Sequence, residues 1–304
     1  MKKLLLATTA LVGSAGFAAA EVSVSGDARM GVLYDNYYAD SVSFDSRARV
    51  NFSLSGETDG GLSFGASFRA DNATTAAEGL SGAVFLSGEF GTISMGDVES
   101  AAENAVGDLA GVGYTSFSAF GDWYLIDPGA FDGGLGNEME YIATGDDEMA
   151  LYQYSAGAVT LYASVGQPGD GVVSYSVAGR YDAEQFSVSL GYEDLEGFGS
   201  HIIGGVQGTF GNVTVKAIYG TMSADAPFVD VDQYGVSGSY TMDALTVDGF
   251  WRNTKAETGE EIAAYGIGAT YDLGGGAAIE GGVGQIDTGP SKNTIADLGV
   301  TFEF

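Results

Sequence analysis

Long segments of this chain alternate strictly between apolar and polar residues, and this pattern restricts the fold more than any other feature. From Val42 to Leu54 the large apolar side chains share one parity, and all the charged side chains take the other. Because successive side chains of a strand point to opposite faces, such a segment predicts a β-strand with one apolar and one polar face. The same pattern recurs in residues 62–69, 186–193 and 213–220.

Strand length and turn spacing choose between a soluble β-sandwich, which alternation alone also fits, and a membrane barrel. The segments run longer than the roughly 5–6 residues of soluble strands, toward the roughly 9–11 that cross a bilayer. Short turns at one rim and longer loops at the other are typical of outer-membrane barrels. Tight connections are predicted at residues 58–60, 89–91, 156–157, 182–184, 210–212, 242–243 and 274–276. Open connections are predicted at residues 35–40, 71–78, 167–171, 194–200, 223–229, 253–259 and 287–293.

The tight turns give the size of the barrel. Seven of them pair fourteen strands, and a first strand at 22–34 and a last at 293–304 raise the number to about sixteen. We therefore expect an all-β fold, a closed antiparallel transmembrane barrel with a water-filled lumen, with 14 or 18 strands as the alternatives. Residues 98–148 lack sustained alternation but are rich in aromatics, which indicates an ordered segment that folds into the barrel and narrows it.

The first twenty residues have the features of a secretory signal. Lys2 and Lys3 precede a short apolar core, and Ala18, Ala19 and Ala20 form a small-residue cleavage site. We expect residues 1–20 to be removed and residues 21–304 to form the barrel domain. A membrane anchor is the alternative, and the shortness of the apolar stretch disfavours it.

Charge excludes several classes of function. Without Lys2 and Lys3 the chain has 9 basic and 41 acidic residues, so it lacks the basic footprint that nucleic-acid binding needs. His201 is the only histidine and no cysteine is present, so no nucleophile–histidine or histidine–metal constellation stands out. The sequence predicts a protein that is not an enzyme and needs no cofactor.

Several segments resemble the trimeric general porins in their alphaproteobacterial form. These are residues 24–32, 46–50, 85–88, 95–97, 271–276 and 296–300, together with the C-terminal Phe304, which is similar to the family's assembly signal. The resemblance spans the chain after the signal. It implies a homotrimer of 16-stranded barrels in the bacterial outer membrane, each with a third loop bent inward. It also implies passive diffusion of small hydrophilic solutes and ions.

Charged residues suggest how such a pore selects solutes. Four arginines on the first three predicted strands, Arg29, Arg47, Arg49 and Arg69, have the polar, lumen-facing parity. We expect this basic cluster to face acids of residues 98–148 and to set up a transverse field across the pore. The alternative is ordinary charge pairing that supports the loop. The candidate acids are Glu99, Glu103, Asp108, Asp122 and Asp127.

The acidic outer loops suggest further partners. They could bind divalent cations that bridge to lipopolysaccharide, and Asp230 with Asp232, and Asp146, Asp147 and Glu148, are the densest oxygen clusters for calcium. A solvated acidic loop is the simpler interpretation. Aromatic residues near predicted strand ends are expected to form girdles in contact with outer-membrane lipid, with strand packing as the alternative. They are Tyr34, Tyr181, Tyr192, Phe210, Tyr219, Tyr240, Trp251, Tyr271 and Phe304.

Two other classes of protein stay open at this point. One is a barrel enzyme or a dedicated binding channel of the same architecture. The other is a soluble secreted β-sandwich or adhesin. Detergent-dependent solubility separates the sandwich from the barrels, and conductance across a lipid bilayer separates a pore from an enzyme.

Overall fold

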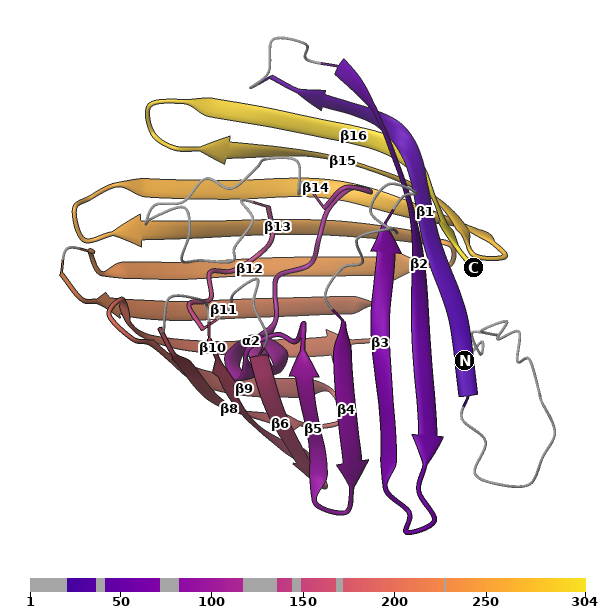
Figure 1. The fold of residues 1–304 in the computed structure, drawn as a ribbon. Helices are drawn as coiled ribbons and strands as arrows, with labels where there is room; N and C mark the ends of the chain where they lie inside the picture. Colours follow the sequence, from indigo (N-terminus) through magenta and orange to yellow (C-terminus); the bar gives the residue numbers. More distant parts are fainter. Residues whose placement is uncertain are drawn as a thin grey trace.

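The computed structural model describes residues 21–36, 42–71, 82–116, 136–143, 149–167, 172–226 and 228–304. Figure 1 shows that antiparallel strands make up almost all of this part of the chain. The first eight strands are β1 (Glu21–Asp35), β2 (Val42–Glu57), β3 (Ser63–Asp71), β4 (Ala83–Gly88), β5 (Gly91–Gly96), β6 (Met149–Ala156), β7 (Val159–Gly166) and β8 (Ser174–Asp182). The others are β9 (Phe186–Leu195), β10 (Gly199–Phe210), β11 (Val213–Ala224), β12 (Val231–Met242), β13 (Leu245–Ala256), β14 (Glu261–Gly274), β15 (Ala277–Asp287) and β16 (Lys292–Glu303).

Each strand pairs with its sequence neighbours, and β1 pairs with β16, so the sheet closes into a barrel (Figure 1). The predicted all-β closed barrel with sixteen strands is confirmed over the described residues. Each of the seven predicted tight connections joins consecutive strands at the same rim.

Several predicted open connections are shorter than expected, and in residues 253–259 β13 continues to Ala256. Residues 194–200 were expected to form a loop, but β9 continues to Leu195 and β10 begins at Gly199. Ser200 pairs with Asp194 in the ladder, because backbone groups make the ladder hydrogen bonds and polar side chains do not prevent them. Only residues 196–198 turn, with Gly197 at a φ of 80°.

The two faces of the wall differ as the alternation predicts. On β2, Phe44, Val50 and Leu54 are exposed on the outer face, while Arg47 and Arg49 occupy the opposite parity and are partly buried. All nine aromatic residues expected to form the girdles are exposed. An apolar exterior around a polar interior is the arrangement that suits hydrocarbon outside and water inside. No helix in the described residues has the length and apolarity to cross a membrane.

The buried core lies between the wall and the segment that follows β5, and not at a sheet–sheet interface. Ala102, Val106 and Leu109 of this segment pack against Ile203 and Ile218 of the wall. Ile203 and Ile218 lie on the inward faces of β10 and β11, where most other positions are polar residues or glycine. Apolar side chains on the inner face therefore mark the footprint of the segment.

The segment contains a short helix, α2 (Ala101–Val106), which the glycine-rich composition did not predict. Ser100 caps its N-terminus by accepting a hydrogen bond from the Glu103 N–H, and the helix ends at Gly107 with a φ of 60°. Six residues are too few for a stable isolated helix, so contacts with the wall hold it in place.

Candidate functional site: the inner wall and the segment packed on it

Wall serines of β7 and β8 fix the position of α2, which packs mainly on β8 and β9. The Ala101 N–H donates to the Ser164 hydroxyl at 3.0 Å, and the Ala102 N–H donates to the Ser176 hydroxyl at 2.9 Å. The first N–H groups of a helix have no partner within the helix, so these serines satisfy donors that burial would otherwise leave unpaired.

Inward-facing glycines let the segment approach the backbone of the wall. A Cβ atom added at Gly191 would lie 2.5 Å from the Cβ of Ala102, and one at Gly235 would lie 2.5 Å from Cδ1 of Leu109. Such distances are too short for any side chain. The absence of a side chain at these positions is therefore what allows the close contact.

Three basic residues of the wall bind backbone carbonyl groups of the segment. Lys216 donates to the carbonyls of Val106 and Asp108, each at 2.6 Å. Arg180 donates to the Ala105 carbonyl at 3.4 Å. Arg252 donates to the Glu138 carbonyl, lies 3.7 Å from the Glu140 carboxylate, and is 2% exposed. The role of these cations was not predicted from the sequence. Each lies on the inward face of its strand beside an inward apolar residue, and that pattern indicates contact with protein.

The candidate acids of the segment have different environments. Glu99 is exposed, and Glu103 is half-buried in the first turn of α2. Asp108 accepts a hydrogen bond from the Met139 N–H at 2.8 Å. Burial raises the pKa of Asp108 to about 6, the nearby Glu138 charge adds to this, and the cations Lys216 and Arg252 oppose it. Asp122 and Asp127 lie outside the described residues.

The four arginines of the basic cluster share the inner face of β1, β2 and β3. The register sets Arg29 directly opposite Arg47, an unfavourable pairing of like charges. Acids of the same strands lie beside them, and all the ion pairs are short. They are Arg29–Asp45 at 2.9 Å, Arg47–Asp27 at 3.0 Å, Arg49–Asp71 at 2.8 Å and Arg69–Asp71 at 2.7 Å.

The cluster meets the segment at Tyr114. Arg29 donates to the Tyr114 carbonyl at 3.3 Å, and its guanidinium lies 5.6 Å from the centre of the Tyr114 ring. Asp297 of β16 accepts hydrogen bonds from the N–H and the hydroxyl of the adjacent Thr115. The segment therefore contacts β7 at Ala101 and contacts β1 and β16 at Tyr114 and Thr115. Wall acids that neutralise the arginines were missed in the sequence analysis, although Asp27, Asp45 and Asp71 share their parity.

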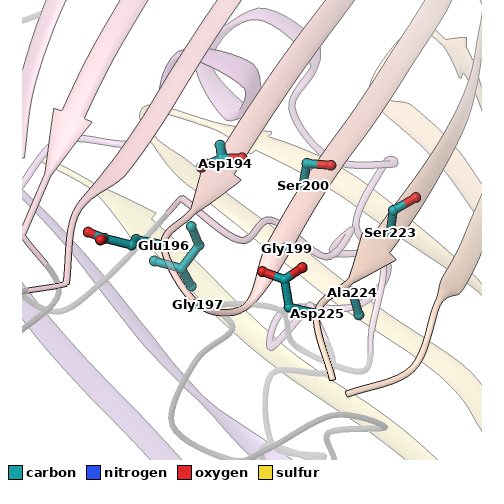
Figure 2. Close-up of a pocket in the computed structure, with 9 residues that line it drawn as sticks. Asp194, Glu196, Gly197, Gly199, Ser200, Ser223, Ala224 and Asp225 are labelled. Atoms are coloured by element: carbon teal, nitrogen blue, oxygen red, sulfur yellow. The ribbon is translucent and has the colours of Figure 1, made fainter. Parts of the chain in front are cut away.

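The acidic rim provides no assembled metal site in the described residues. Figure 2 shows a pocket between β9, β10 and β11 in which the carboxylates of Asp194, Glu196 and Asp225 point in different directions. Asp230 accepts from the Ala224 N–H, and Asp232 accepts from the Tyr219 hydroxyl. No group of three or more acidic or histidine residues in the described ranges could hold a metal. The other predicted calcium cluster, Asp146 to Glu148, lies outside those ranges.

A closed barrel with an apolar exterior, a charged interior and a segment packed inside it defines a transmembrane β-barrel channel. The sequence also matches the family of Gram-negative porins over residues 7–291. A porin of Rhodobacter capsulatus is 39% identical over 320 residues, which cover 93% of this chain and 100% of the relative. A porin of Fuscovulum blasticum is 27% identical, with the same coverage.

Solved structures agree. A porin structure refined at 1.8 Å superposes with a TM-score of 0.79 and 37% identity, covering 93% of this chain and all of that chain. An engineered variant of the Rh. blastica porin gives a TM-score of 0.69 at 26% identity, over the same 93% of this chain. The chain belongs to the Gram-negative porin family. It is an outer-membrane channel protein and not an enzyme.

Proposed function

We propose that small hydrophilic solutes and ions cross this barrel through a lumen narrowed by residues 98–148. The observation that carries the proposal is the packing of residues 100–116 and 136–143 against the inner face of the wall. A polypeptide inside the barrel occupies space that water would otherwise fill. Single-channel recording with a graded series of neutral solutes tests the proposal, since a narrowed pore excludes solutes that an open sixteen-stranded barrel admits.

The charges on β1, β2 and β3 then select among the solutes that fit. The four arginines and the three wall acids form a polar surface opposite the wall that binds the segment. The predicted acids of residues 98–148, including Asp122 and Asp127, add negative charge on the side of the segment. Opposed charges across a narrow pore orient dipolar solutes and disfavour apolar ones of similar size.

Charge removal tests this selectivity. Arg47→Ala or Arg49→Ala should shift the reversal potential in a salt gradient toward cations. Asp27→Asn should shift it toward anions, because Asp27 lies 3.0 Å from Arg47 and its loss leaves that charge unbalanced. Wild-type conductance and reversal potential in all three variants would refute the proposal for the basic cluster.

The short strands beside the cluster support self-association into a homotrimer. β4 and β5 have six residues each, fewer than the roughly 9–11 that a strand needs to cross the hydrocarbon core. A neighbouring copy could cover this short-stranded part of the wall, and Phe44 on β2, which β3 separates from β4, is 93% exposed. Native mass measurement in detergent tests the trimer, and a monomeric mass would contradict it.

The remaining partners are lipid, lipopolysaccharide and divalent cations at the acidic rim. The exposed aromatic residues suit the membrane interface, and the net charge of −30 suits cation bridging to lipopolysaccharide phosphates. Chelation with EDTA should reduce the retention of lipopolysaccharide during purification. The signal peptide has a separate test, since N-terminal sequencing of the membrane-inserted protein should begin at Glu21.

A further inference from the structure

Three polar side chains are buried where the segment meets the wall near the ends of β9, β10 and β12. Glu193 of β9 is 0% exposed, His201 of β10 is 1% exposed and Gln233 of β12 is 2% exposed. None of them lines a path for solute. An ionisable group removed from water costs considerable free energy unless hydrogen bonds replace its hydration, so their contacts identify their role.

Glu193 accepts three hydrogen bonds. Its Oε1 accepts from the Ser100 hydroxyl at 2.6 Å, and its Oε2 accepts from the Ile142 N–H and from His201 Nδ1, both at 3.0 Å. Ser100 caps α2 at the start of the segment, whereas Ile142 lies near its end. A single wall carboxylate therefore ties both ends of the segment to β9 through charge-assisted hydrogen bonds.

Gln233 determines the protonation of the histidine. Its Oε1 accepts from the Glu140 N–H at 2.8 Å, and its Nε2 donates to the Glu140 carbonyl at 2.7 Å. This orientation leaves Nε2 of Gln233 facing Nε2 of His201 at 3.0 Å. Since an amide nitrogen can only donate, His201 Nε2 must accept, and the network assigns an uncharged imidazole with its proton on Nδ1.

We propose that Glu193 is the positioning residue that holds Ser100 and Ile142 on the wall, and that an uncharged His201 lets Gln233 hold the Glu140 backbone beside them. Protonated His201 would direct an N–H toward the Gln233 amide nitrogen, and rotating that amide would break both bonds to Glu140. Acid therefore removes the two hydrogen bonds that hold the Glu140 backbone on Gln233. The effect on the pore rests on the proposed function, in which this segment narrows the lumen.

The groups around His201 leave Glu193 as its ionisable hydrogen-bond partner among the described residues. Tyr141 of the segment packs edge-on, with 6.3 Å between ring centres, and burial holds its pKa well above the usual range, so it stays neutral. On β11, Gly220 faces His201 Nε2 and carries no side chain. Gln233, the other hydrogen-bond partner of His201, carries no charge.

Hydrogen exchange tests the positioning role without depending on transport. In Glu193→Gln the Ile142 amide should exchange about tenfold faster, because it loses a charged acceptor. Glu280→Gln is the matched control, since Glu280 also faces the lumen and accepts a hydrogen bond from the Thr301 hydroxyl of the wall. Unchanged exchange at Ile142 in Glu193→Gln would overturn the proposal.

A pH series separates positioning from simple packing. After correction for intrinsic exchange, wild-type protection of the Glu140 amide should fall about tenfold between about pH 8 and about pH 5, while His201→Gln should show no such dependence. Asp108→Asn should keep the wild-type dependence, which excludes titration of Asp108 as the cause. Equal pH dependence in wild type and His201→Gln would refute the role of His201.

Neutral-solute exclusion in the same variants links the contact to the pore. In single-channel recordings with neutral solutes, the Glu193→Gln channel should spend roughly tenfold more of its time in a second conductance level than the Glu280→Gln channel. Faster exchange at Ile142 with an unchanged exclusion limit would uphold Glu193 as the anchor and refute the narrowing of the lumen by this segment. The two proposals therefore fail on different readouts.

Discussion

The two sides of the barrel use the same residue type in opposite ways. On β1, β2 and β3, arginines pair with aspartates of neighbouring strands and keep contact with the lumen. On β8, β11 and β13, Arg180, Lys216 and Arg252 bind backbone carbonyls of the inserted segment. The first wall leaves its ion pairs partly exposed, although Arg29 also binds the Tyr114 carbonyl, whereas the second wall uses its cations to hold polypeptide. Parity places all of these side chains inside, so their roles depend on what packs opposite them.

The largest difference between the two walls should appear in stability. Arg252→Ala removes a buried cation and leaves the Glu138 carbonyl and the Glu140 carboxylate without it, which we expect to cost about 3–5 kcal/mol. Arg47→Ala, its counterpart on the other wall, should cost about 0–1 kcal/mol. Urea unfolding in lipid vesicles measures both, and similar values would break the comparison.

The close approach of the segment should give the next largest effect. Gly235→Ala places a Cβ atom 2.5 Å from Leu109, so we expect a loss of roughly 1–3 kcal/mol and a displaced segment. Gly238→Ala in the same strand is the control, because its nearest contact would be 3.7 Å. Thermal unfolding of the two variants, with neutral-solute exclusion as a second readout, distinguishes them. Equal stability would mean that Leu109 moves aside freely.

Titration of Asp108 sharpens the comparison on the anchoring wall. Its pKa is raised from 3.8 to about 6, so the folded protein holds a proton in a pH range where the unfolded chain has released it. Stability therefore decreases as the pH rises from about 4 to 6 and stays low above that range. Asp108→Asn should remove this dependence and be more stable than wild type at about pH 8, by about 1 kcal/mol. Parallel stability–pH curves for the two proteins would contradict this.

The smallest effect on stability should come from the solute-facing wall. Asp71 bridges Arg49 and Arg69, yet these pairs are partly exposed, so Asp71→Asn should cost no more than about 1 kcal/mol. The same change should shift the reversal potential toward anions. A large destabilisation without a shift in selectivity would mean that this wall is structural as well.

The barrel itself could be predicted because its cause is local. Strand parity in residues 42–54 follows from neighbouring residues alone, and the tight turns carry their own glycine and aspartate signals. The four arginines could be placed on the inner face for the same reason. The helix α2 could not be predicted, because the serines that receive its first N–H groups lie on β7 and β8, distant in the sequence.

The sequence by itself determined which side chains face lipid and which face the lumen, since parity is a property of each strand. Only the tertiary structure decided which lumen-facing charges stay accessible to water and which contact protein. Arg47 and Arg252 both face inward and carry the same charge, but Arg47 pairs with Asp27, whereas Arg252 contacts Glu138 and Glu140. Closure of the barrel around the inserted segment creates that difference, because contacts between residues far apart in sequence set how far water reaches each charge.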